Sequence, residues 1–193
     1  MHAMLTEGGD MPPAGPLINS GVRAVYGRGI GGTRKLSYPD QILIELAGTY
    51  RRYNACVERI LILGIPSQKQ KTRYAIVEET LLEMLEMFRP GILLGTIDQI
   101  HRHKLDSAGF GKYRYSACGY SLGATFRPTW MDTPPIIYEG NPLVLESGMV
   151  FFPHVMLSDT DNRLGIGLGQ TVVVTENGFE VLTKSPTELI IQI

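Results

Sequence analysis

The sequence predicts an α+β protein, in which helices pack on a largely antiparallel sheet. Apolar residues recur at helical spacing over residues 67–88, while short β-type segments dominate the chain after Lys112. Asn177-Gly178 is a strong signal for a two-residue hairpin turn. Helices grouped apart from antiparallel strands are typical of the α+β class.

The first third of the chain is predicted to be irregular and then to form a strand pair. Residues 7–40 are rich in turn-forming residues, especially glycine. Residues 41–48 and 57–63 are apolar and carry β-branched side chains, so each predicts a strand. The short segment 50–54 between them is expected to link them as an antiparallel pair.

Two helices and a series of strands are expected after this pair. Ser67 can cap the first helix, and Arg89-Pro90-Gly91 ends it. Thr96 is expected to cap a second helix, which runs to about Ser107 and ends at Gly109. The later strand candidates are residues 150–156, 169–175, 180–182 and 189–193.

The composition is that of a globular domain without a strong charge. Of 193 residues, 44% are apolar and 19% are charged, with a formal net charge of −1. This balance gives no electrostatic reason to expect a nucleic acid or a membrane as partner. The first residues lack the pattern of a secretory signal, so a cytoplasmic location is expected. Cys56 and Cys118 form no C-x-x-C pair, so neither a disulfide framework nor a structural zinc site is expected.

Glu45 is the first candidate for chemistry, because it lies inside an apolar strand. A carboxylate buried in that way is costly unless it is paired or used in function. The structural alternative is an ion pair with Arg51, Arg52 or Arg59.

The glycine-rich segments and the histidines favour structural roles. Residues 29–32 and 165–169 lack the strand–loop–helix order of a nucleotide site, so they predict turns and close backbone approaches. His101 and His103 are two residues apart on the second helix, face different directions and are expected to be solvated. His154 lies within a predicted strand, and as sequence alone it predicts a buried, hydrogen-bonded core histidine.

Four segments, taken in order, resemble the creatinase/aminopeptidase family, which has the pita-bread fold. They are residues 89–91, 119–123, 145–151 and the hairpin 171–183. The resemblance extends from about Glu7 to Leu182 and implies a curved antiparallel sheet with helices packed on it. It also implies that residues 1–193 form a single C-terminal, catalytic-type domain. That domain would be incomplete at its N-terminus, with its first helices and a separate N-terminal domain missing.

The resemblance places a two-metal site at positions where this chain has other residues. Metallopeptidases of this family hold two metal ions with two Asp, one His and two Glu. Carried over one by one, these positions are Leu46 (with Glu45 beside it), Cys56, Tyr120, His154 and Gly169. None keeps the family's ligand. Because two divalent ions need several carboxylates to offset their mutual repulsion, we expect no metal and no other cofactor.

The metal-free branch of the family, creatinase and especially the ectoine-hydrolase type, is more similar. The features that carry this are residues 45–48 with the Arg-Arg-Tyr turn that follows, residues 119–123, and the Pro-x-Trp-x-acid loop at 128–132. They imply a metal-independent hydrolase that opens a C–N bond in a small amino-acid derivative or a dipeptide.

This branch suggests a role for each candidate residue. Glu45 would act as a general acid–base or as a covalent nucleophile. Tyr120 and His154 would orient substrate or stabilise charge. Substrate contacts are expected from three further residues: Trp130 as an apolar wall, Asp132 as partner of a cationic group, and Gln170.

Two other functions stay open on the sequence. The first is a catalytically silent pita-bread module that is kept for binding or dimerisation. The second is a true Xaa-Pro peptidase or aminopeptidase, which ranks last because the metal ligands are missing. The family implies a homodimer as well as a small-molecule substrate.

Overall fold

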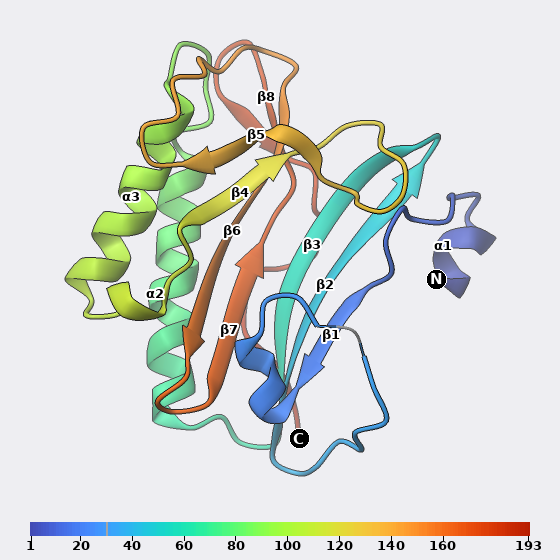
Figure 1. Cartoon of the computed structure of the whole chain (residues 1–193), viewed down its shortest axis with the longest axis vertical. Helices are drawn as coiled ribbons and strands as arrows, with labels where there is room; N and C mark the ends of the chain where they lie inside the picture. Colours follow the sequence, from blue (N-terminus) through green and yellow to red (C-terminus); the bar gives the residue numbers. More distant parts are fainter. Residues whose placement is uncertain (30) are drawn as a thin grey trace.

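The computed structural model describes residues 1–29 and 31–193, and the side chains of all of these but 133 and 134. A curved, mostly antiparallel sheet carries two long helices on one side (Figure 1). The predicted α+β class is confirmed, and the curved sheet with helices packed on it is the architecture that the resemblance implies. Ile30, within the first glycine-rich segment, lies outside the described residues.

The sheet brings together strands from both ends of the chain. Its order is β1-β2-β3-β7-β6-β4-β5, with β10 parallel to β3 and the β8–β9 hairpin attached to β6. Its strands are β1 Leu17–Ser20, β2 Asp40–Tyr50, β3 Tyr53–Leu63, β4 Ala117–Ser121, β5 Asp132–Tyr138, β6 Val150–Asp159, β7 Leu164–Gly169, β8 Val172–Val174, β9 Phe179–Val181 and β10 Ile190–Gln192. The helices are α1 His2–Thr6, α2 Gln68–Leu85 and α3 Leu94–Ser107, with 3₁₀ turns at Gly21–Val25 and Gly111–Tyr113.

The β2–β3 hairpin confirms the predicted strand pair and is longer than predicted. Its two-residue turn is Arg51-Arg52, with φ of 48° and 71°. Since hairpin turns of two residues favour positive φ, this is the geometry that continues the twist of the strands, although it is unusual for arginine. The turn carries both arginines away from Glu45, which lies in the middle of β2.

The two long helices agree with the sequence except at one cap. At α2, the Ser67 side chain accepts from the Gln70 backbone while the Gln70 side chain accepts from the Ser67 backbone, so the predicted cap is confirmed. At α3 the prediction of Thr96 as the cap is wrong. The helix begins at Leu94 without a capping side chain, because the backbone carbonyls of Leu143 and Asn141 accept from its first two N–H groups.

The second glycine-rich segment is a strand, not a turn. Residues 165–169 lie within β7, between β3 and β6. The expected close approaches are confirmed, because a Cβ on Gly167 would lie 2.4 Å from Glu58 Oε1 and one on Gly169 would lie 2.4 Å from Phe152 Cζ. The strand predicted over residues 169–175 is therefore two elements, since β7 ends at Gly169 and β8 begins at Val172.

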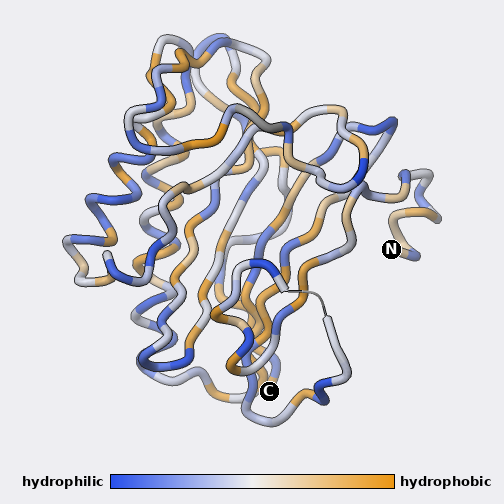
Figure 2. The backbone as a smooth tube through the Cα atoms, viewed as in Figure 1, coloured by the Kyte–Doolittle hydropathy of each residue, from blue (hydrophilic) through white to orange (hydrophobic). Residues whose placement is uncertain are grey.

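The main core lies between the helices and the sheet, where hydrophobic segments face each other (Figure 2). His101 belongs to the buried face of α3 that also carries Ile97 and Leu105. The prediction that His101 is solvated is therefore wrong, because the three-to-four-residue spacing of this face turns it inward. His103 is exposed, as predicted. Among the described helices, none is both long enough and apolar enough to cross a membrane.

Two neighbouring leucines of α2 test the placement of this core. Leu81 is 0% exposed and Leu82 is 47% exposed. We expect Leu81→Ala to lower the free energy of unfolding by about 2–5 kcal/mol, because it leaves a cavity between α2 and the sheet. Leu82→Ala, the matched control, should stay within about 0.5 kcal/mol of the wild type. Urea unfolding measures both, and equal losses would contradict this packing.

Candidate active site

The candidate site lies on one face of the β2–β3 hairpin. The register pairs Glu45 with Glu58 and Ala47 with Cys56, so these four side chains point to the same side of the sheet. Leu46 and Arg59 point to the other side. The hairpin thus places two carboxylates next to each other on one surface.

A chain of hydrogen bonds holds Glu45. The Tyr120 hydroxyl donates to Glu45 Oε1 at 2.7 Å, and Trp130 Nε1 donates to the Tyr120 oxygen at 2.8 Å. Because the hydroxyl has one proton and Trp130 occupies its acceptor side, that proton is directed at Glu45. The structure therefore brings together Glu45, Tyr120 and Trp130, three residues that the sequence singled out.

The Glu45 carboxyl is buried and has a raised pKa. Only 9% of the residue is exposed, and this burial raises the pKa of the Glu45 carboxyl, while the Tyr120 hydrogen bond and the positive charge of Arg28 lower it in part. The proposed ion pairs with Arg51, Arg52 and Arg59 do not form. The first two sit at the hairpin tip, and Arg59 points to the opposite face.

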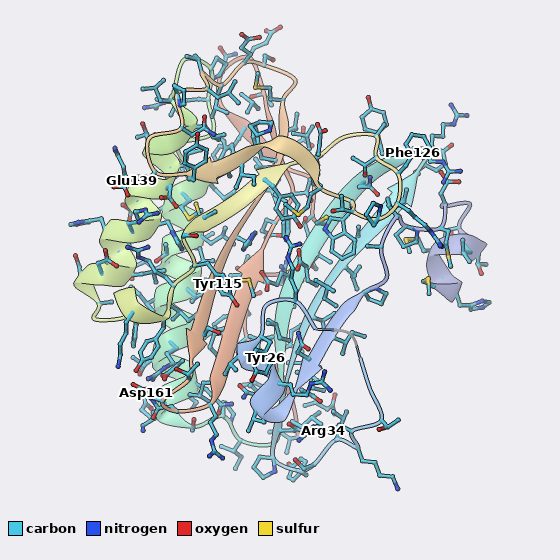
Figure 3. All side chains as sticks on the ribbon, in the orientation of Figure 1. Tyr26, Arg34, Tyr115, Phe126, Glu139 and Asp161 are labelled. Carbon is cyan, nitrogen blue, oxygen red and sulfur yellow. The ribbon has the colours of Figure 1, made fainter. Side chains whose placement is uncertain are left out.

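Two cavities meet at Glu45. One of about 190 Å³ is lined by the carboxylate together with Tyr120, His154 and Tyr115, the last of which is labelled in Figure 3. The other, of about 160 Å³, extends toward Trp130 and Leu17. The residues that line both cavities are Arg28, Glu45, Tyr120 and Met131. The carboxylate therefore faces space that a small molecule can enter.

Glu58, which pairs with Glu45 across the hairpin, was not singled out by the sequence analysis. It is 1% exposed, and neither of its carboxylate oxygens has a hydrogen-bond partner among the described residues. Burial, followed by the nearby charge of Glu45, raises the pKa of Glu58 well above its usual value. Its carboxylate lies over Gly167, in the space that the missing Cβ leaves. Like Glu45, Glu58 is a carboxylate inside an apolar predicted strand, and that pattern could have selected it.

His154 is a neutral neighbour of this pair. Its Nδ1 atom lies 3.9 Å from Glu58 Oε2, and its ring packs edge-on against Tyr120. Burial, and then the charges of His101 and Arg28, lower the pKa of His154 to about 3. The expectation of a hydrogen-bonded core histidine is not met, because Nδ1 has no partner among the described residues. At neutral pH this side chain offers hydrogen bonds rather than a positive charge.

Three of the residues selected from the sequence lie elsewhere. Leu46 points away from Glu45, so on geometry it is Glu45 that shares a face with Cys56. Asp132 is exposed at the start of β5 and lines neither of the two cavities. Gln170 accepts a hydrogen bond from Arg59, which points to the other side of the hairpin, and it lines neither of the two cavities. Arg59 also binds Ser185, which anchors the C-terminal segment there.

The donor set does not fit the two-metal centre that the resemblance places here. Cys56 is a buried thiol whose pKa is raised by burial and by Glu45, and Gly169 has no side chain. Residues 1–29 and 31–193 contain one cluster of three or more His, Cys, Asp or Glu side chains with donor atoms within 4.8 Å of one another. That cluster includes neither Glu45 nor Glu58. Glu45 and Glu58, one of them hydrogen-bonded to a tyrosine, supply fewer oxygen donors and less negative charge than two divalent ions need.

Arg28 is the other functional candidate that sequence reasoning missed. It follows the 3₁₀ turn at Gly21–Val25, and its guanidinium contacts Met131 Sδ at 3.0 Å, over the junction of the two cavities. A single arginine in an irregular, glycine-rich segment gives no periodic signal that could have selected it.

Comparison with known proteins identifies relatives along the whole chain. The model for "Metallopeptidase family M24" matches residues 1–176. An Xaa-Pro dipeptidase from Pyrococcus horikoshii is 29% identical over 191 residues, which are 98% of this chain and 52% of the relative. An ectoine hydrolase from Halomonas elongata is 26% identical over 185 residues, 96% of this chain and 46% of the relative. The crystal structure of the Pyrococcus horikoshii prolidase aligns with a TM-score of 0.90 at 28% identity, covering 98% of this chain and 53% of that one. The chain thus spans about half the length of the relatives it matches.

The pH dependence of stability tests the state of Glu58. In the unfolded chain a glutamate ionises near pH 4.3, whereas the raised pKa keeps Glu58 protonated in the folded state. The contribution of this group to stability is therefore present at low pH and is lost as pH rises, by about 1.4 kcal/mol per pH unit until the folded group ionises. Glu58→Gln removes this loss.

We expect Glu58→Gln to become more stable relative to the wild type as pH rises from about 5 to about 8. Chemical unfolding at both pH values measures the difference. Glu180→Gln, at an exposed position of β9, is the control and should show a difference independent of pH. A pH-independent difference for Glu58→Gln as well would contradict the buried, protonated carboxyl.

Proposed function

The chain belongs to metallopeptidase family M24, and on that premise we propose that it hydrolyses a C–N bond in a small amino-acid derivative without a metal ion at this site. The observation that carries the proposal is Glu45, buried, held by Tyr120 and facing two small cavities. The relatives named for dipeptide and ectoine hydrolysis support the bond type and the substrate size. A homodimer and a cytoplasmic location remain predictions.

The reaction we propose uses Glu45 as a general base and then as a general acid. Its ionised carboxylate removes a proton from water as the water oxygen bonds to the substrate carbon. The same proton then passes from Glu45 to the leaving nitrogen as the C–N bond breaks. Since Tyr120 occupies Oε1, Oε2 is the oxygen left to exchange this proton. A pKa raised by burial suits both steps, because it brings the base closer to neutral pH.

The surrounding side chains would bind and orient the substrate. Arg28 supplies a positive charge where the two cavities meet, which favours a substrate that carries a carboxylate. Neutral His154 supplies a hydrogen bond to the polar group at the reacting carbon. Trp130 and Met131 form an apolar wall in the smaller cavity. Cavities of about 190 and 160 Å³ restrict the substrate to a small molecule.

Replacement of Glu45 tests its role. We expect Glu45→Gln to lower kcat by about 10²–10⁴-fold with the fold intact, because the amide cannot accept the proton. The assay uses Xaa-Pro dipeptides, ectoine and N-acyl amino acids as substrates. Wild-type turnover should be unchanged by a chelator and not stimulated by added manganese, cobalt or zinc. Glu146→Gln, at an exposed position, is the control.

Four results would count against this proposal. Full activity in Glu45→Gln would remove the carboxylate from the reaction. Activity that depends on added manganese or cobalt would instead indicate a metal-dependent Xaa-Pro peptidase. No turnover of any substrate, together with a stable protein partner, would favour the silent binding module. A single turnover in ¹⁸O-water that labels Glu45 would indicate a covalent intermediate in place of general-base catalysis.

The Tyr120 hydroxyl sets the pH at which Glu45 becomes active. Its hydrogen bond lowers the pKa of Glu45, so Tyr120→Phe should raise that pKa. A general base must be ionised, so the acidic limb of the kcat/KM profile should move up by about 1–2 pH units, equivalent to the 1.5–3 kcal/mol of a hydrogen bond to a charged group. Tyr115→Phe, which alters the same cavity without touching Glu45, should leave this limb in place. An unmoved limb in Tyr120→Phe would contradict the arrangement.

A further inference from the structure

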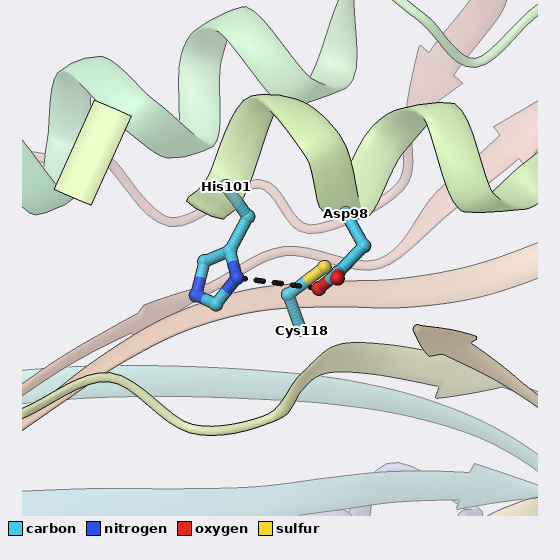
Figure 4. A group of neighbouring side chains, drawn as sticks. All are labelled: Asp98, His101 and Cys118. Atoms are coloured by element: carbon cyan, nitrogen blue, oxygen red, sulfur yellow. Dashed lines mark ion pairs between the residues drawn. The ribbon is translucent and has the colours of Figure 1, made fainter. Parts of the chain in front are cut away.

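A second cluster of ionisable side chains lies between α3 and β4, outside both cavities (Figure 4). Asp98 and His101 are one turn apart on α3, and Cys118 faces them from β4. Their ligand atoms all lie within 4.8 Å of one another, and all three side chains are buried. The proposed hydrolysis uses none of them.

Two atoms of this cluster are buried without a hydrogen-bond partner. His101 Nδ1 and Asp98 Oδ1 lie 3.3 Å apart, the separation dashed in Figure 4, but their geometry is not that of a hydrogen bond. Neither atom has another partner among the described residues. A buried polar atom left without a partner costs stability. A shared ligand between the two atoms would remove that cost.

The separation of these atoms matches that of two ligands on one tetrahedral zinc ion. With zinc–nitrogen and zinc–oxygen distances of about 2.0–2.1 Å, a tetrahedral angle places the two ligand atoms about 3.3–3.4 Å apart. Thiolate and imidazole ligands are those that zinc prefers. The three side chains supply three ligands, and a water molecule would take the fourth position of the tetrahedron.

The charges around the cluster balance for a divalent ion. Arg102 Nε donates to Asp98 Oδ2 at 2.5 Å, which orients the carboxylate and leaves Oδ1 for the ion. Arg102 also lies 3.3 Å from Glu139. The two positive charges of zinc and that of Arg102 are cancelled by Asp98, Glu139 and a Cys118 thiolate. A neutral group avoids most of the cost of burying isolated charges.

We propose that Asp98, His101 and Cys118 bind one zinc ion, which ties α3 to β4 and is acquired as the chain folds. This ion is structural and separate from the reaction at Glu45. It revises the expectation that two distant cysteines exclude structural zinc, because the other two ligands come from a helix rather than from a second cysteine pair.

Metal content and cobalt spectroscopy of the full chain test this site. Purified wild-type protein, dialysed against metal-free buffer, should contain about one zinc per chain by elemental analysis. Exchange for cobalt should give a thiolate-to-cobalt charge-transfer band in the wild type. That band identifies a cysteine ligand without any substitution, so the test stands even where a variant fails to fold.

The two cysteines provide a matched pair. Cys118→Ser should lose the charge-transfer band and most of the zinc, His101→Ala should lose most of the zinc, and Cys56→Ser should keep both. Removal of zinc should lower the Tm of the wild type while kcat measured well below that Tm is unchanged, which separates this site from the one at Glu45. Wild-type protein without stoichiometric zinc or cobalt, or binding that survives in Cys118→Ser, would overturn the proposal.

Discussion

The burial of two carboxylates on one face of the β2–β3 hairpin is the constraint on which the candidate site depends. Glu45 and Glu58 are directly paired across the two strands, and like charges in that position destabilise a hairpin when both are ionised. Burial adds to this, since each charge would lie in a medium of low dielectric. The neighbouring residues therefore have to keep one carboxyl protonated and give the other a specific hydrogen-bond donor.

The surrounding strands meet these two requirements in different ways. Tyr120 reaches Glu45 from β4, 75 residues along the chain, and its hydrogen bond favours the ionised form. Glu58 lies over Gly167 of β7 and beside neutral His154, without a donor among the described residues, which favours its protonated form. One face of the hairpin thus holds two carboxyls with different proton affinities. A site that moves protons needs such a difference.

The sequence predicted most of the fold, because periodicity and caps are local signals. The α2 cap at Ser67 and the β2–β3 pair were recognised in that way. It misread residues 165–169, since glycines that allow close packing between strands look like turn residues until their neighbours are known. The structure brings together Glu45, Tyr120 and Trp130, which the sequence had singled out, and places Glu58 and Arg28 near them, which it had not. The sequence could not place Gln170 relative to the cavities, because its position depends on the pairing of β3 with β7.

The proton affinity of the two buried carboxyls is therefore the central claim, and an NMR titration tests it most directly. Glutamate side chains labelled with ¹³C at the carboxyl report ionisation one residue at a time, and the signals that vanish in Glu45→Gln and Glu58→Gln identify the pair. Exposed glutamates titrate near pH 4.3. The structure predicts that both paired signals titrate at higher pH, with Glu58 the last to ionise. Two signals that titrate together with the exposed glutamates would contradict the account.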